Sequence, residues 1–166
     1  NVEVIYLLAN TCAEELMRAY GHDEPQVEAS CSGGGTLVNA RFVASIGFAG
    51  EHLKGSLVLV CDQATAQLLQ PAELGETPGT PEVLADVLGE LSNQLVGRLK
   101  NQLLSRGLTL ALGTPMLVYG QLLSLPSPPE AFSFWSRVGS PGLELTFRVD
   151  LYLEPEFELA SEAGAI

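Results

Sequence analysis

The sequence predicts an α+β fold in which helices pack on an antiparallel sheet. Two long segments, 1–20 and 81–106, carry apolar residues at helical spacing. Each is followed by about three segments rich in β-forming residues, so the chain repeats the order of one long helix and then strands. With 166 residues, of which 46% are hydrophobic, the chain has the size and composition of one folded domain.

The first half contains one predicted long helix and three predicted strands. Ile5 and Leu16 belong to the apolar stripe of the helix over residues 1–20, and Gly21 is a natural stop. The strands are expected at 26–32, 36–48 and 56–61, with a turn at 32–35 and a hairpin connection at 50–55. One or two helical turns are expected at 64–70.

The second half begins after a proline-containing linker at 71–81. Thr80 is a good N-cap and Pro81 suits the first helical position, so a second long helix is expected over 81–106. The strands that follow are expected at 116–123, just after Pro115, and as a hairpin of 132–138 with 143–153. A single domain is expected over 1–154, followed by an acidic, frayed tail at 155–166.

Trp135 lies in the first strand of the last predicted hairpin. It is expected to pack within that hairpin. The alternative is that its strand is a sheet edge with which a second copy of the chain pairs.

The charge of the chain argues against two classes of partner. Acidic residues outnumber basic ones 20 to 8, which gives a net charge of −12. No cluster of Lys and Arg offsets this field, which repels phosphate backbones and anionic membrane surfaces. No apolar run approaches the ~18 residues of a transmembrane helix. We therefore expect neither nucleic acid nor a membrane as a partner.

The cysteines indicate a reducing compartment. Cys12, Cys31 and Cys61 form an odd, scattered set without a CxxC motif. Such a set fits small core residues better than a disulfide framework. No basic segment typical of a signal peptide opens the chain. A cytoplasmic protein is the expectation.

A polar stripe on the second predicted helix is the strongest functional signal. Asp86, Glu90, Asn93 and Gly97 recur at i, i+4, i+7 and i+11, which places them on one face of a helix. The leucines that fall on roughly the opposite side are Leu84, Leu88, Leu91, Leu95 and Leu99. One face can therefore be buried while the other presents a carboxylate and an amide. Those groups suit the binding of a lysine and the positioning of a water, which favours phosphoryl hydrolysis.

The spacing Asp86-x-x-x-Glu90-x-x-Asn93, followed after 21 residues by Pro115, resembles the signature of the CheC/CheX/FliY chemotaxis phosphatases. The segment DVLGELSNQLVGRLKNQL, with Gly97 four residues after the asparagine, is most similar to the CheX branch. The resemblance implies a CheC-like fold and hydrolysis of the aspartyl phosphate of a CheY-like response regulator. It also implies a homodimer, one site per subunit, and no cofactor of its own, because Mg²⁺ comes with the phosphorylated partner.

Within this resemblance, each residue of the stripe has an expected role. Asn93 would orient the attacking water, since an amide both accepts and donates hydrogen bonds. Glu90 would pair with a lysine of the regulator and fix the register of the two proteins. Asp86, Gly97 and Pro115 are expected at the partner interface, where Gly97 would permit close approach.

Other interpretations remain. The polar stripe is also compatible with an ordinary solvated helix face. The same fold could serve as a non-catalytic module that binds a response regulator or supports assembly. A hydrolase that uses Glu90 as a general base is a weaker alternative, because no second carboxylate at suitable spacing and no nucleophile accompany it. Binding of a regulator without faster dephosphorylation would favour the non-catalytic module.

Overall fold

The computed structural model describes residues 1–31, 36–70 and 79–159. The predicted turn at 32–35, most of the predicted linker and the end of the predicted tail lie outside these residues. The elements, in chain order, are α1 (Val2–Ala19), β1 (Gln26–Cys31), β2 (Thr36–Ala49), β3 (Leu53–Cys61), α2 (Gln63–Leu68), α3 (Pro81–Leu104), β4 (Ala111–Leu112), β5 (Met116–Pro126), β6 (Phe132–Ser140) and β7 (Leu143–Leu153). The α+β class is confirmed.

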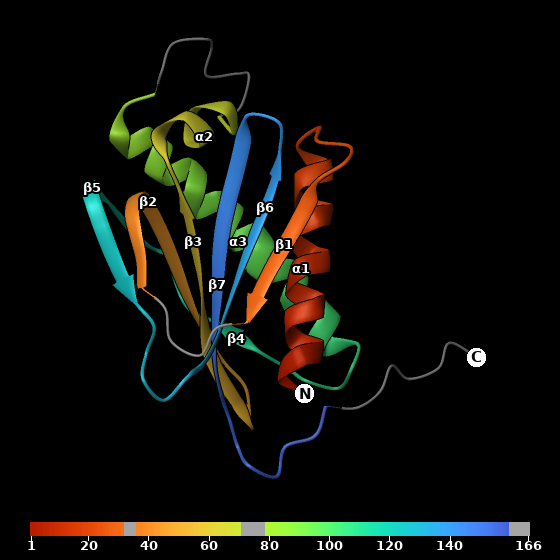
Figure 1. Cartoon of the computed structure of the whole chain (residues 1–166). Coiled ribbons are helices and arrows are strands. Elements are labelled where there is room, and N and C mark those ends of the chain that lie inside the picture. The colour runs from red at the N-terminus through yellow and green to blue at the C-terminus, as the bar shows by residue number, and fades with distance from the viewer. Residues whose placement is uncertain (32–35, 71–78, 160–166) are drawn as a thin grey trace.

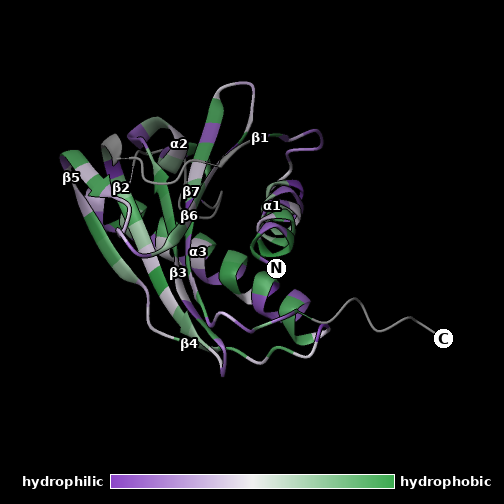
Figure 2. Ribbon diagram, turned by 60° about the horizontal axis from the view of Figure 1, so that its bottom comes forward, coloured by the Kyte–Doolittle hydropathy of each residue, from purple (hydrophilic) through white to green (hydrophobic). Residues whose placement is uncertain are grey.

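The strands of the described residues form one seven-stranded sheet. Its order is β1-β6-β7-β3-β2-β4, with β5 also paired to β2, and the pairings are antiparallel. The long helices α1 and α3 cover the same face of this sheet (Figures 1 and 2). α1 packs over β1 and β6, while α3 packs over β2, β3 and β5, and the two helices contact each other.

The main core lies between the helices and the sheet. It contains the predicted leucine face of α3, and these five side chains are at most 1% exposed: Leu84, Leu88, Leu91, Leu95 and Leu99. Facing them are side chains from the sheet such as Phe42 and Phe147. Burial of such apolar surface contributes roughly 25 cal/mol per Å², which holds α3 in place and fixes which of its faces is exposed.

Several predicted boundaries need correction. β3 begins at Leu53 rather than residue 56, so Gly55 lies within the strand and not in the hairpin connection. There the chain packs closely, since a Cβ on Gly55 would lie 2.3 Å from the backbone oxygen of Asp150. α3 ends at Leu104, and β4 was not predicted because a two-residue exposed strand leaves no periodic pattern.

β6 is an interior strand, which makes the edge interpretation of Trp135 wrong. β1 pairs with one side of β6 and β7 with the other. Trp135 is 8% exposed, and the guanidinium of Arg148 lies 4.8 Å from its ring centroid. The side chain packs in the hairpin on the outer face of the sheet, as the first interpretation expected.

The end of β5 and the start of β2 cover part of the outer face of the sheet, which is the face opposite α1 and α3. The β2–β5 pairing shifts register on both sides of Ala40, and Leu122 has a left-handed φ of 55°. Beyond the bend, Leu123 and Leu125 pack against a small second core formed by Ala40, Val43, Val58 and Val60. Figure 1 shows the end of β5 beside the start of β2, in front of the rest of the sheet.

Arg148, on β7, forms hydrogen bonds to the end of β5 and so holds it against the sheet. Its Nη1 donates to the carbonyl oxygens of Leu125 and Pro126 at 3.0 and 3.1 Å, and its Nε donates to Asp150 at 2.9 Å. Arg148 and Asp150 are 5% and 1% exposed, so they form a buried ion pair. The hydroxyl groups of Ser133 and Ser56 also donate to Asp150.

The last described residues contact the first residue of the chain. The side chain of Asn1 donates to the backbone oxygen of Phe157 and accepts from the backbone N–H of Leu159. Both of these tail residues are partly buried against the main core. The predicted domain boundary at residue 154 stays a prediction. Among the described residues, no helix is both long and apolar enough to cross a membrane.

Candidate functional site on helix α3

Helix α3 starts where its sequence signals place it. The Thr80 side chain accepts a hydrogen bond from the backbone N–H of Val83 at 3.4 Å, and Pro81 occupies the first turn. The Glu82 carboxylate accepts a hydrogen bond from the hydroxyl of Tyr119 on β5 at 2.8 Å. Hydrogen bonds from its own backbone N–H, from Tyr119 and from Thr80 lower the pKa of Glu82.

The structure brings Asp86, Glu90 and Asn93 together on the exposed face of α3. Within the described part of the chain, the side chains of Asp86 and Asn93 form no hydrogen bond or ion pair. Glu90 differs, because its Oε1 accepts a hydrogen bond from Nε2 of Gln94 at 2.9 Å. The face thus presents one free carboxylate, one oriented carboxylate and one free amide within about two helical turns.

The two glycines of α3 have opposite surroundings. A Cβ added at Gly97 would meet nothing within 4 Å, whereas one added at Gly89 would lie 2.9 Å from Cδ2 of Leu117. Gly89 therefore allows β5 to pack against the helix. No described residue packs against Gly97 in this way, so the polar face of α3 has open space at this position.

Pro115 lies just before β5, the strand that packs against α3. The Tyr119–Glu82 hydrogen bond and the approach of Leu117 to Gly89 show that β5 runs opposite to the helix. Since Pro115 precedes Leu117 by two residues, it lies on the Asn93 side of that contact. The structure thus places Pro115 near the middle of α3, half-buried.

Two further side chains border the stripe and were not predicted as site residues. Gln94 uses the same amide group to donate to Glu90 and to the hydroxyl of Tyr20, at 2.9 and 3.4 Å. Gln94 could have been suspected, because it stands four residues after Glu90. Tyr20 could not, because it caps α1, 74 residues earlier in the chain.

Nothing in the described residues offers a metal centre. No group of three or more His, Cys, Asp or Glu side chains in that part of the chain is arranged to hold a metal ion. Cys12 and Cys61 are buried, and burial raises the pKa of both thiols to about 12, which disfavours the thiolate form that a nucleophile needs. The side chain of Cys31 lies outside the described ones.

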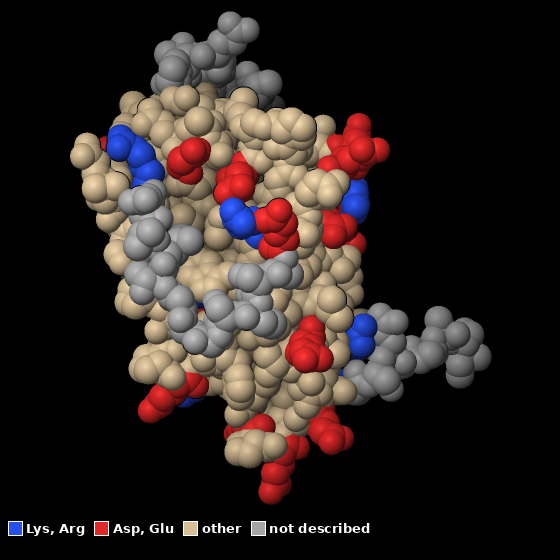
Figure 3. Space-filling model, in the orientation of Figure 1, with Lys and Arg blue, Asp and Glu red and all other residues tan. Residues whose placement is uncertain are grey.

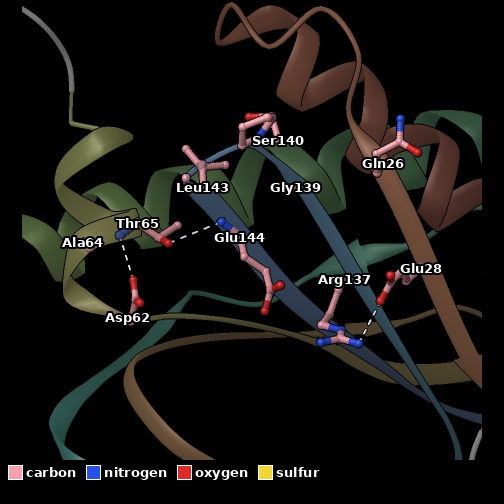
Figure 4. Close-up of a pocket in the computed structure, with 12 residues that line it drawn as sticks. Gln26, Glu28, Asp62, Ala64, Thr65, Arg137, Gly139, Ser140, Leu143 and Glu144 are labelled. Atoms are coloured by element: carbon pink, nitrogen blue, oxygen red, sulfur yellow. Dashed lines mark hydrogen bonds and ion pairs between the residues drawn. The ribbon is translucent and has the colours of Figure 1, made fainter.

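An open cleft of about 650 Å³ lies on the other face of the sheet, between β1, β6, β7 and the start of α2 (Figure 4). Most of the charged side chains that line it form ion pairs or hydrogen bonds. Glu28 pairs with Arg137 at 2.8 Å, and Asp62 accepts from the backbone N–H of Thr65 at 2.8 Å. Figure 3 shows acidic and basic side chains in the upper part of this face and acidic ones at its lower margin. No residue of α3 lines the cleft.

Solved structures of chemotaxis proteins share this fold. A CheC-like superfamily protein from Shewanella sp. PV-4 is 18% identical, with a TM-score of 0.75 over 89% of this chain and 97% of its own. CheX from Vibrio vulnificus is 17% identical, with a TM-score of 0.76 over 87% and 96%. A chain of the CheX–CheY–BeF₃–Mg²⁺ complex from Borrelia burgdorferi is 16% identical, with a TM-score of 0.67 over 90% and 96%.

The family itself is shown by the sequence. No curated protein sequence matches the chain. The family model described as chemotaxis phosphatase CheX matches residues 42–137, which is more than half of the chain and includes the whole of α3 and Pro115. The chain belongs to the CheX family of chemotaxis phosphatases.

Proposed function

We propose that the chain accelerates hydrolysis of the aspartyl phosphate of a CheY-like response regulator, with its site on the exposed face of α3. The observation that carries the proposal is the free amide of Asn93, one turn from the oriented carboxylate of Glu90, on a helix fixed by its buried leucine face. Membership of the CheX family and the fold shared with a chain of a CheX–CheY complex support a regulator as the partner.

In the proposed reaction, water attacks the phosphorus in line with the bond to the aspartate oxygen. That P–O bond breaks, which releases the aspartate carboxylate and inorganic phosphate. Asn93 accepts a hydrogen bond from the attacking water through its carbonyl oxygen, so the water is held at the angle that the in-line path requires. Mg²⁺ bound to the regulator stabilises the phosphoryl oxygens, and the chain contributes no metal of its own.

Glu90 has a different task in the proposal. Its carboxylate pairs with a lysine of the regulator and so sets the register in which Asn93 reaches the phosphoryl group. Asp86, one turn earlier on the same face, adds negative charge beside that contact. Gly97 and Pro115 shape the surface around the contact that Glu90 and Asn93 make with the regulator. The expected homodimer stays a prediction, which sedimentation of the purified chain tests.

The experiment is to phosphorylate a CheY-like regulator, remove the phosphodonor and follow its decay at constant Mg²⁺ with and without the chain. Faster decay that scales with the amount of chain supports the phosphatase. A regulator that binds the chain when it carries Mg²⁺ and BeF₃⁻, yet decays at its own rate, favours the non-catalytic module instead.

Replacing Gly97 with alanine is expected to stabilise the fold and to weaken binding of the regulator. The free energy of unfolding should rise by up to about 1 kcal/mol, because alanine is the better helix former and its Cβ meets nothing within 4 Å. Affinity for the Mg²⁺- and BeF₃⁻-loaded regulator should fall, because the added methyl group stands in the approach path. Urea unfolding and a binding titration on the same sample measure both. Unchanged affinity would remove Gly97 from the interface.

A further inference from the structure

Three side chains from two helices form a short hydrogen-bonded row beside the proposed site. Nε2 of Gln94 lies 2.9 Å from Oε1 of Glu90 and 3.4 Å from the hydroxyl oxygen of Tyr20. Glu90 is exposed, whereas Gln94 and Tyr20 are half-buried. One amide nitrogen thus lies within hydrogen-bond distance of two different oxygens, and its two N–H groups can serve both.

We propose that Gln94 and Tyr20 are positioning residues that hold the Glu90 carboxylate ready for the lysine of the regulator. The proposal rests on the proposed function, since it assigns Glu90 that lysine as its partner. A glutamate on a helix surface ordinarily samples several rotamers and must lose this freedom when a partner docks. A carboxylate that is already held has less freedom to lose, so the docked complex forms with higher affinity.

The chemistry of Gln94 suits this task. An amide donates a hydrogen bond without neutralising the carboxylate, and it contacts only Oε1 of Glu90. The second oxygen and the full negative charge remain for an incoming ammonium group. A lysine at the same position would instead pair with Glu90 and compete with the partner, because opposite charges at i and i+4 of a helix attract each other.

Tyr20 anchors one end of the row to a second helix. Tyr20 is the C-cap of α1, and Gly21 follows with a φ of +87°, so the chain turns away directly after it. α1 is held against α3 by the shared core and by an ion pair between Glu15 and Arg98 at 3.5 Å. The hydroxyl of Tyr20 is therefore a fixed acceptor, supplied by one helix to a side chain of another.

The experiment compares Gln94→Ala, Gln94→Lys and Tyr20→Phe with the unmodified chain. Binding is titrated with a regulator loaded with Mg²⁺ and BeF₃⁻, and the decay rate of the phosphorylated regulator is measured at saturating chain. Gln94→Ala should raise Kd between about twofold and tenfold, while the saturated rate stays within about twofold because Asn93 is untouched. Tyr20→Phe should raise Kd less, and Gln94→Lys should raise it most.

Two controls separate positioning from general structure. Gln102→Ala makes the same change in the same helix, at a side chain outside the row, and should leave Kd unchanged. In a Glu90→Ala background, Gln94→Lys should lose its effect, because the carboxylate that it captures is gone. Additive effects of these two substitutions would overturn the proposal.

A readout on the free chain distinguishes this proposal from the proposed function. Side-chain NMR couplings of Glu90 should indicate one rotamer in the unmodified chain and an average of several in Gln94→Ala. If the couplings change in this way and Kd does not, the positioning role is overturned while the phosphatase stands. If the unmodified chain neither binds the regulator nor accelerates its decay, the proposed function fails and this inference falls with it.

Discussion

Asn93→Ala is expected to lower the saturated rate of regulator dephosphorylation by about 10²–10³-fold, equivalent to about 3–4 kcal/mol of transition-state stabilisation. The physical reason is the loss of the group that orients the attacking water, with no replacement from the neighbouring side chains. Asn93 is exposed and its side chain makes no hydrogen bond within the described residues, so its replacement removes no such contact from the fold. Alanine is also the better helix former, so the variant should be as stable as the parent chain.

The rate is measured by single-turnover decay of the phosphorylated regulator at saturating chain, so that binding does not limit it. Asn101→Ala is the matched control, because it makes the same change at another exposed position of α3. Affinity for the Mg²⁺- and BeF₃⁻-loaded regulator should change little in Asn93→Ala. Undiminished activity in this variant would mean that another group positions the water.

Arg148→Ala is expected to lower the free energy of unfolding by about 3–5 kcal/mol. The substitution leaves the carboxylate of Asp150 buried without its guanidinium partner, at 1% exposure. It also removes the hydrogen bonds to the carbonyl oxygens of Leu125 and Pro126 and the contact with the Trp135 ring. The end of β5 should therefore lose its attachment to the outer face of the sheet.

Urea unfolding measures the loss, and Arg137→Ala is the control. The Arg137–Glu28 pair has a similar distance, 2.8 Å, but its side chains are 56% and 72% exposed. An exposed pair contributes between about 0 and 1 kcal/mol, so this control should unfold almost as the parent does. Equal losses in the two variants would mean that the burial of Arg148 has no energetic consequence.

The sequence predicted those parts of the fold that depend on local pattern. The leucine spacing of α3 and its Thr80–Pro81 start specify a helix with one buried face, and the structure has both. The exposure of Asp86, Glu90 and Asn93 follows from the same spacing, since residues opposite a buried stripe face outward. Their chemical roles depend on a partner, so they remain proposals.

The parts that the sequence did not predict are tertiary. Arg148 stands on the outer side of its strand, where alternation alone predicts exposure. It is buried because β5 bends at Leu122 and returns over that face, and a left-handed leucine has no sequence signal. The link from Tyr20 to Gln94 likewise exists only because two helices distant in sequence pack together.

In the proposed complex, Glu90 and Asn93 face the phosphorylated site of a regulator. The most direct test is a crystal structure of the chain in complex with a CheY-like regulator that carries Mg²⁺ and BeF₃⁻. We expect the Asn93 amide oxygen to lie about 3 Å from the in-line position of the attacking water, and the Glu90 carboxylate to pair with a lysine of the regulator. A complex in which another surface meets the regulator and this face of α3 points to solvent would contradict it.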